Sequence, residues 1–160
     1  MNKTEIYKYL TGKNIPYEVT EHMAVFNMEG LKSVELPYGE WIAKNLFIRD
    51  DKKRSYYLIT VKGDKRVDLK EFRRRQGLRA LSFAASEELL SIMGLTPGSV
   101  TPFGILNDKE HRVHFYLDAE FIGNKIGVHP NDNTATVWMQ ADDLVKLIQK
   151  FGNEAEFSLI

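Results

Sequence analysis

A lysine and an asparagine stand together inside an apolar stretch, and this is the first place where the sequence could do chemistry. Lys44 and Asn45 interrupt the segment Trp41–Ile48, which otherwise has the composition of a buried strand. A lysine in such a strand is costly unless its ammonium group reaches water or an anion. Lys44 could therefore face solvent from an edge strand, or it could place a positive charge in a pocket, and both interpretations stay open.

Two polar loops further along the chain could also carry chemistry. In residues 95–104, Pro97 and Pro102 stiffen the backbone while Gly98 allows it to approach a ligand closely. The N–H groups of such a loop can hold a carbonyl oxygen or an oxyanion, although it could equally be a plain connection. The second loop follows Gly127 and contains His129. The polar residues 131–134 can each bond their own turn, so a self-capped hairpin loop is the alternative.

Several common catalytic and metal-binding patterns are missing from the sequence. There is no Gly-x-Ser-x-Gly elbow, no P-loop and no His-Glu-x-x-His, and the absence of cysteine removes disulfides and thiolate sites. His111 and His114 lie in a strand-like stretch, where a separation of three would point them to opposite faces. We therefore expect no metal and no cofactor.

The elements that must position these residues follow from periodicity and capping signals. Helices are predicted over residues 3–12, 69–76 with Asp68 as N-cap, 87–93 with Ser86 as N-cap and Gly94 as the stop, and 141–151. Strands are predicted over residues 15–19, 41–48, 55–61, 111–117, 125–128 and 134–139. Because strands occur in runs without regular βαβ alternation, the pattern favours an α+β fold with a mostly antiparallel sheet in a single domain, residues 1–160.

Charge is distributed unevenly along a chain whose formal net charge is zero. Residues 44–79 contain 13 basic and 5 acidic side chains, whereas residues 80–160 contain 5 basic and 11 acidic ones. A basic patch of this kind attracts phosphate locally, although a solvated charged surface would have the same composition. No secretory signal and no run of ~18 apolar residues is visible, so we expect a cytoplasmic protein without a membrane partner.

Three segments in order carry a family resemblance. They are Lys44-Asn45-Leu46-Phe47, Gly98-Ser99-Val100-Thr101-Pro102, and Gly127-Val128-His129-Pro130 followed by Asn133-Thr134-Ala135-Thr136. Together they resemble the YbaK/prolyl-tRNA-synthetase-associated editing domain family, and within it the free-standing Ala-tRNA(Pro) deacylases called ProXp-ala or PrdX. The resemblance covers nearly the whole chain. It implies a mostly antiparallel, barrel-like sheet flanked by helices, and trans-acting hydrolysis of alanine attached in error to proline tRNA.

The resemblance also implies roles for particular residues. Lys44, Gly98 and His129 match the catalytic positions. The positions expected to bind substrate are Asn45, Arg49, Ser99, Pro102 and Gly127. Arg49 stands where relatives commonly have lysine, which keeps the positive charge but not the detailed contact.

An aminoacyl ester is already activated, so the implied reaction needs no strong nucleophile. The site has to position the ester, stabilise its oxyanion and present water, and in this family the ribose hydroxyl of the substrate is thought to assist. Lys44 would bind the terminal phosphate or hold the ester, without a covalent intermediate. The apolar wall of the amino-acid pocket is expected among Val25, Phe26, Met28 and Leu31.

The expected partner is the acceptor end of tRNA(Pro) carrying alanine, with prolyl-tRNA synthetase as a further partner and no DNA. The candidate tRNA surface consists of Lys62, Lys65, Arg66, Lys70, Arg73, Arg74, Arg75 and Arg79. Two alternatives remain open. The substrate could be another mischarged tRNA, such as cysteine or serine on proline tRNA, or the chain could be a non-catalytic module that binds tRNA or a synthetase.

Overall fold

The computed structural model describes residues 1–32 and 34–160. The α-helices are α1 (Lys3–Gly12), α2 (Met28–Lys32), α3 (Leu69–Gln76), α4 (Ser86–Met93) and α5 (Ala141–Phe151). Short 3₁₀ helices are η1 (Gly39–Trp41), η2 (Pro102–Asn107) and η3 (Ala119–Phe121). The strands are β1 (Glu18–Glu21), β2 (Ala43–Asp50), β3 (Tyr56–Lys62), β4 (Leu81–Phe83), β5 (Val113–Asp118), β6 (Lys125–Val128), β7 (Ala135–Gln140) and β8 (Ala155–Ser158).

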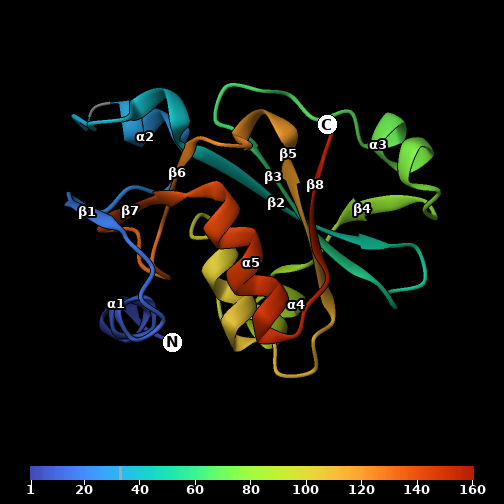
Figure 1. Ribbon diagram of the computed structural model, residues 1–160. Helices are drawn as coiled ribbons and strands as arrows, with labels where there is room; N and C mark the ends of the chain where they lie inside the picture. The colour runs from blue at the N-terminus through green and yellow to red at the C-terminus, as the bar shows by residue number, and fades with distance from the viewer. Residues whose placement is uncertain (33) are drawn as a thin grey trace.

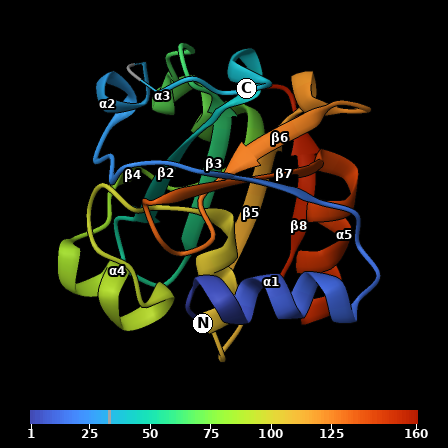
Figure 2. The same ribbon diagram turned by 90° about the vertical axis from the view of Figure 1, so that its left-hand side faces the viewer.

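The strands form two sheets, which confirms the α+β class (Figures 1 and 2). The larger sheet has the order β4-β2-β3-β5-β8, and the smaller has the order β1-β7-β6. Four of the six strand pairs are antiparallel, whereas β3–β5 and β5–β8 are parallel. An isolated bridge between Ile42 and Gly127 joins the sheets. The expected barrel is not closed, because the larger sheet ends at β4 on one side and at β8 on the other.

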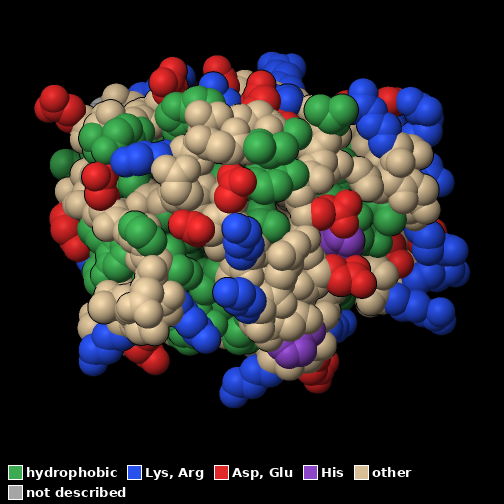
Figure 3. All heavy atoms as spheres, viewed as in Figure 1, with side chains coloured by type: hydrophobic (Ala, Val, Ile, Leu, Met, Phe, Trp, Pro, Cys, Tyr) green, Lys and Arg blue, Asp and Glu red, His purple; other side chains and the backbone are tan. Residues whose placement is uncertain are grey.

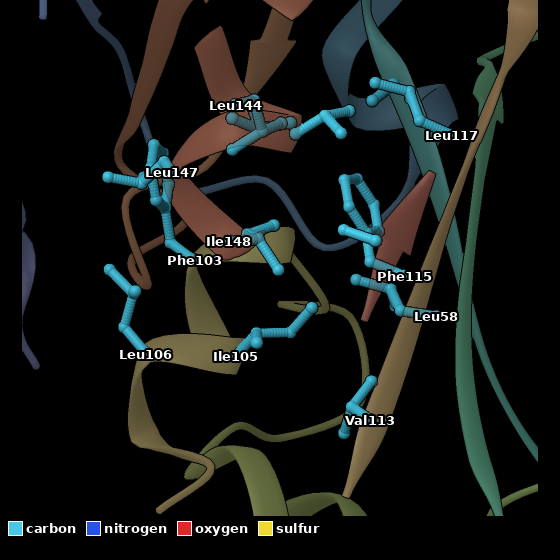
Figure 4. Packing of buried hydrophobic residues seen from close by; sticks show 14 of the residues in the cluster. Leu58, Phe103, Ile105, Leu106, Val113, Phe115, Leu117, Leu144, Leu147 and Ile148 are labelled. Atoms are coloured by element: carbon cyan, nitrogen blue, oxygen red, sulfur yellow. The ribbon is translucent and has the colours of Figure 1, made fainter. Parts of the chain in front are cut away.

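Both faces of β3 are buried, which explains its continuous apolar sequence. On one face, Leu58 contributes to the main core, which Figure 4 shows between the sheet, α5 and η2. On the other face, Tyr57, Ile59 and Val61 pack with Phe72 of α3. The large sheet is therefore a central layer covered by helices on both sides, and the small sheet lies across one end of it beside α1 (Figure 2).

Local signals predicted the helices well. The helices over residues 3–12, 69–76 and 141–151 have the expected bounds, and the Asp68 side chain accepts a hydrogen bond from the Glu71 N–H at 3.1 Å. Ser86 is the first residue of α4 and not its N-cap. The residue before it, Ala85, instead donates its N–H to the Glu88 carboxylate at 2.8 Å.

Three predicted strands begin at least two residues later than expected. β2 starts at Ala43 and not at residue 41, because Trp41 belongs to η1. β1 starts at Glu18, where pairing with Trp138 begins, because Pro16 has no N–H to donate to a ladder. β5 starts at Val113, because His111 adopts a left-handed conformation with φ of 54° in the preceding turn. The short elements α2, β4 and β8 were not predicted.

A buried polar cluster secures this turn, and it leads to a prediction about stability. The Asp108 carboxylate, which is 2% exposed, accepts from the Val113 N–H and from the Asn153 side-chain amide, each at 2.8 Å. Asp108→Ala would leave the Val113 N–H and one of the two N–H groups of the Asn153 amide without this acceptor, so we expect the free energy of unfolding to fall by about 2–4 kcal/mol. Urea unfolding measures this change. Asp64→Ala, at an exposed carboxylate, should stay close to wild type, and equal midpoints for the two variants would contradict the prediction.

Candidate active site

A pocket of ≈ 170 Å³ opens where the start of β2, the segment leading into α2, the Gly98 loop and the end of β6 meet. Its lining residues come from four separate parts of the chain. They are Phe26, Asn27, Met28, Leu31, Ala43, Lys44, Asn45, Gly98, Val100 and His129. The three segments that carry chemistry in the sequence therefore meet at one cavity.

Lys44 lies near the start of β2, beyond the stretch Ile48–Asp50 where β4 pairs with this strand. It pairs with Val61 of β3, lines the pocket and is half-buried. Its ammonium group donates to the backbone carbonyl of Lys65, in the turn that follows β3. The Lys65 ammonium is in turn held 2.6 Å from the Asp118 carboxylate, which is nearly buried. Lys44 therefore lies at the pocket, and a role of its charge there stays a prediction.

Asn45 ties the strand to the Gly98 loop. Its side-chain amide donates to the Val100 carbonyl at 3.2 Å, and its carbonyl oxygen accepts from the Thr60 hydroxyl at 2.6 Å. Thr60 is fully buried, so this pair fixes the asparagine side chain against β3. The observed contacts give Asn45 a positioning role for the loop in addition to its place in the pocket lining.

The Gly98 loop presents backbone donors beside the pocket. Gly98 has φ of 89°, and a Cβ there would lie 3.0 Å from the Phe26 carbonyl oxygen. The Ser99 N–H closes a turn on the Thr96 carbonyl at 3.1 Å, whereas the N–H groups of Gly98 and Val100 have no acceptor within residues 1–32 and 34–160. Such donors can stabilise a developing negative charge on oxygen.

His129 is joined to the Gly98 loop through its own backbone, since its carbonyl accepts from the Thr101 hydroxyl at 2.6 Å. Its Nδ1 lies 2.8 Å from the Ala135 carbonyl oxygen. A carbonyl only accepts, so Nδ1 carries the proton, and in the neutral ring Nε2 has a free lone pair. Burial lowers the pKa of His129, and the nearby His22, whose ring lies 6.0 Å away, lowers it further.

His22 is a site neighbour that sequence reasoning missed. Its Nδ1 lies 2.8 Å from the Met23 carbonyl oxygen, and its Nε2 lies 3.0 Å from the Thr136 hydroxyl. Thr136 lines a narrow cleft that also touches Asn45 and His129. No local pattern marks His22, because it comes next to His129 only through the pairing of β1 with β7 and the approach of β6.

The pH response of His129 leads to a second prediction. Burial favours the neutral ring, so the folded pKa lies below the usual value of about 6.5, and the unfolded chain binds the proton more readily. The stability that neutral His129 contributes is therefore complete above pH ~6.5 and is lost as the pH falls through the folded pKa. NMR titration of the ring should give a midpoint below 6.5. In urea unfolding, the free energy of unfolding of His129→Gln should fall less than that of wild type between neutral and acid pH. An NMR titration midpoint above pH 6.5 would contradict the prediction.

Gly127, predicted to bind substrate, has a packing role as well. It lies opposite Trp138 in the small sheet, and a Cβ would lie 2.5 Å from the Trp138 ring. Gly127 also lines the narrow cleft beside His129. The glycine therefore allows the indole ring to lie across the strand next to the site.

Three other predicted residues do not line the pocket. The Arg49 guanidinium lies 3.1 Å from the Glu88 carboxylate, which also accepts from the Tyr56 hydroxyl at 2.5 Å. Pro102 is buried at the start of η2, and Ser99 forms the turn described above. A role of these residues in substrate binding stays a prediction.

Three of the four residues expected in the apolar wall line the pocket. They are Phe26, Met28 and Leu31, whereas Val25 is buried, 4% exposed, in a cluster with Trp138. Their contact with an amino acid stays a prediction.

The two histidines considered for a metal have other partners. His111 bonds Asn153, and His114 lies between Glu154 and Glu156. In the described part of the chain, no group of three or more His, Asp or Glu side chains could hold a metal ion, and no helix is long and apolar enough to cross a membrane.

Comparison with known proteins decides the family. The model of the aminoacyl-tRNA editing domain matches residues 27–147, which include every residue that lines the pocket except Phe26. The chain belongs to the aminoacyl-tRNA editing domain family. Editing hydrolyses the ester between an amino acid and its tRNA, so the protein is an aminoacyl-tRNA hydrolase.

Relatives of this editing domain extend over nearly the whole chain. The prolyl-tRNA editing protein ProX of Acetoanaerobium sticklandii is 37% identical over 152 residues, which cover 94% of this chain and 93% of that protein. Prolyl-tRNA synthetase associated domain-containing protein 1 of Danio rerio is 31% identical over 151 residues, covering 92% and 82%. A protein of known crystal structure, described as a proposed trans-editing enzyme for prolyl-tRNA synthetase, has the same fold. The TM-score is 0.74 at 23% identity, and the match covers 98% of this chain and 94% of that chain.

Proposed function

We propose that this editing domain, acting as one unit over residues 1–160, is a trans-acting deacylase that hydrolyses alanine from mischarged tRNA(Pro). The observation that supports this most strongly is the arrangement of Lys44, His129 and the N–H groups of Gly98 and Val100 around one small cavity. Ester hydrolysis needs charge stabilisation and positioned water more than a nucleophile. The names of the relatives connect those proteins with prolyl-tRNA editing and with prolyl-tRNA synthetase.

In the proposed reaction, water adds to the ester carbonyl carbon and the carbonyl oxygen becomes an oxyanion. The Gly98 and Val100 N–H groups stabilise that oxyanion, and Lys44 holds the ester or its neighbouring phosphate. The bond to the ribose oxygen then breaks, and the ribose oxygen takes the proton that the water loses. Neutral His129 offers an acceptor at Nε2 that can orient the attacking water or a ribose hydroxyl. The products are free alanine and uncharged tRNA, with no covalent intermediate.

The size of the cavity supports a small acyl group. Leu31 and Ala43 line it with 8% and 9% exposure, so their side chains form its closed end. A cavity of ≈ 170 Å³ admits alanine, and exclusion of the larger proline ring would have to come from contact with the side chains that line it. A steric limit rejects smaller or isosteric groups poorly, so glycine and serine would be separated from alanine only weakly.

The proposed tRNA surface is the basic region around α3. In Figure 3, Lys and Arg side chains gather at the right-hand edge, over α3, β4 and the β2–β3 turn. Arg74 and Arg75 form ion pairs with Glu71, and Arg79 with Asp51, whereas Lys70 and Arg73 have no ion-pair partner in the part of the chain that the structure describes. The turn that bears Lys65 connects this surface to Lys44 through the carbonyl contact.

A panel of charged tRNAs tests the proposal. Purified protein should release alanine from Ala-tRNA(Pro) and leave Pro-tRNA(Pro) and Ala-tRNA(Ala) intact. The loss of acid-precipitable radiolabel from each charged tRNA measures this release. Faster release from Cys-tRNA(Pro) or Ser-tRNA(Pro) would reassign the amino acid. Salt-sensitive tRNA binding without turnover of any substrate would contradict the enzyme and indicate a binding module. Adding prolyl-tRNA synthetase shows whether that partner accelerates release.

A further inference from the structure

An aromatic side chain at the pocket has no part in the chemistry above. Phe26 lines the pocket, yet 68% of its surface is exposed. Exposure falls along the lining, since Met28 is half-buried and Leu31 is 8% exposed. The Phe26 ring therefore lies at the mouth of the pocket, and Leu31 lies at its closed end.

The backbone of Phe26 is held in place on both sides. Val25 packs inward with 4% exposure, and its N–H donates to the Asn133 carbonyl at 3.2 Å. The Asn27 side chain accepts from a backbone N–H of α2 at 2.8 Å. Gly98 lies against the Phe26 carbonyl, so closely that a Cβ on the glycine would be 3.0 Å from it. The backbone of this segment is therefore anchored, with the Val25 side chain buried and the Phe26 ring exposed to solvent.

The size of the pocket determines which part of an aminoacyl-tRNA end can reach this ring. Ligand pockets that enclose a drug-sized molecule measure about 300–1,000 Å³, whereas this one has ≈ 170 Å³. The cavity therefore has room for a small acyl group and its ester, and the nucleoside that carries them must lie over the mouth. The apolar, flat surface offered there is the Phe26 ring.

Building on the proposed function, we propose that Phe26 forms a nucleobase subsite, on which the 3′-terminal adenine of the tRNA stacks. Stacking of a base on an aromatic ring contributes affinity without reading sequence, because every base has a π-face. Every tRNA ends in the same adenosine, so this subsite anchors the reacting end and leaves tRNA identity to other contacts. The stacked base fixes the ribose at the mouth, which directs the ester toward Lys44 and the Gly98 loop.

The test compares Phe26→Ala and Phe26→Trp with Leu90→Ala, which removes a 58% exposed apolar side chain on α4 that does not line the pocket. The first readout is deacylation of charged tRNA. The second is binding of an uncharged acceptor-stem hairpin that ends in CCA, and of the same hairpin with an abasic 3′ residue. Phe26→Ala should raise KM and weaken CCA-hairpin binding on the order of 10- to 100-fold. Phe26→Trp and Leu90→Ala should stay near wild type, and with the abasic hairpin wild type and Phe26→Ala should be equal.

Two results would overturn the subsite. The first is equal loss of binding for both hairpins in Phe26→Ala, which would show that the ring does not contact the base. The second would be seen if Phe26→Ala changed the ratio of alanine release to proline release but not the difference in binding between the CCA hairpin and the abasic hairpin. That result would place the ring against the acyl group. If wild type deacylates none of the charged tRNAs, the proposed function fails, and the hairpin binding still decides whether Phe26 contacts the terminal base.

Discussion

Replacement of Lys44 by alanine is expected to lower kcat/KM for deacylation by about 100-fold or more, which corresponds to roughly 2.7 kcal/mol or more of transition-state stabilisation. The physical reason is the position of its charge. Lys44 lines the cavity, and the Lys65 carbonyl orients its ammonium, so the charge needs little reorganisation when negative charge develops on the ester. Single-turnover deacylation with excess protein separates this chemical effect from tRNA binding.

Two further variants make the Lys44 result specific. Lys44→Met keeps most of the aliphatic length and removes the charge, so it should be as impaired as Lys44→Ala if the charge matters. Lys32→Ala removes an exposed lysine of α2 that pairs with Glu29, and it should retain full activity. Urea unfolding of all variants checks that the fold is kept. Activity of Lys44→Met close to that of wild type would exclude the electrostatic role.

The second large effect is expected for Gly98→Ala. A side chain at φ of 89° is strained by roughly 1–2 kcal/mol, and the added Cβ would lie 3.0 Å from the Phe26 carbonyl. Relief of this contact must shift the loop and with it the Val100 N–H. A displacement near 1 Å of a group that positions the substrate can lower the rate by about 100-fold, so we expect a 10- to 100-fold loss of kcat.

Gly123→Ala is the matched control for this variant. Gly123 follows η3 with φ of 76°, and no atom lies within 4 Å of a Cβ built there. The conformational strain is therefore similar, while the site is untouched. Both variants should lose comparable stability in urea unfolding, but only Gly98→Ala should lose activity. Equal activity of the two would show that the Gly98 loop does not present the oxyanion donors.

The sequence anticipated which segments meet at the site but not all of their contacts. Lys44, Gly98 and His129 line one pocket together with Phe26, Met28 and Leu31, and their roles there stay predictions. Arg49 does not, because it pairs with Glu88 at the other end of β2. The sequence of β2 places Arg49 five positions after Lys44. It does not reveal that α4 brings the Glu88 carboxylate next to Arg49.

By itself, the sequence determined the elements that depend on near neighbours. The Asp68 cap marks the start of α3, and the apolar spacing of residues 141–151 defines α5, because capping and helical periodicity act within a few residues. Only the tertiary structure decided the parallel pairing of β5 with β3 and β8, the edge strand β4, and the approach of His22 to His129. These contacts join residues far apart in the chain. Their free energy comes from burial and pairing in the folded sheet, which local propensity does not encode.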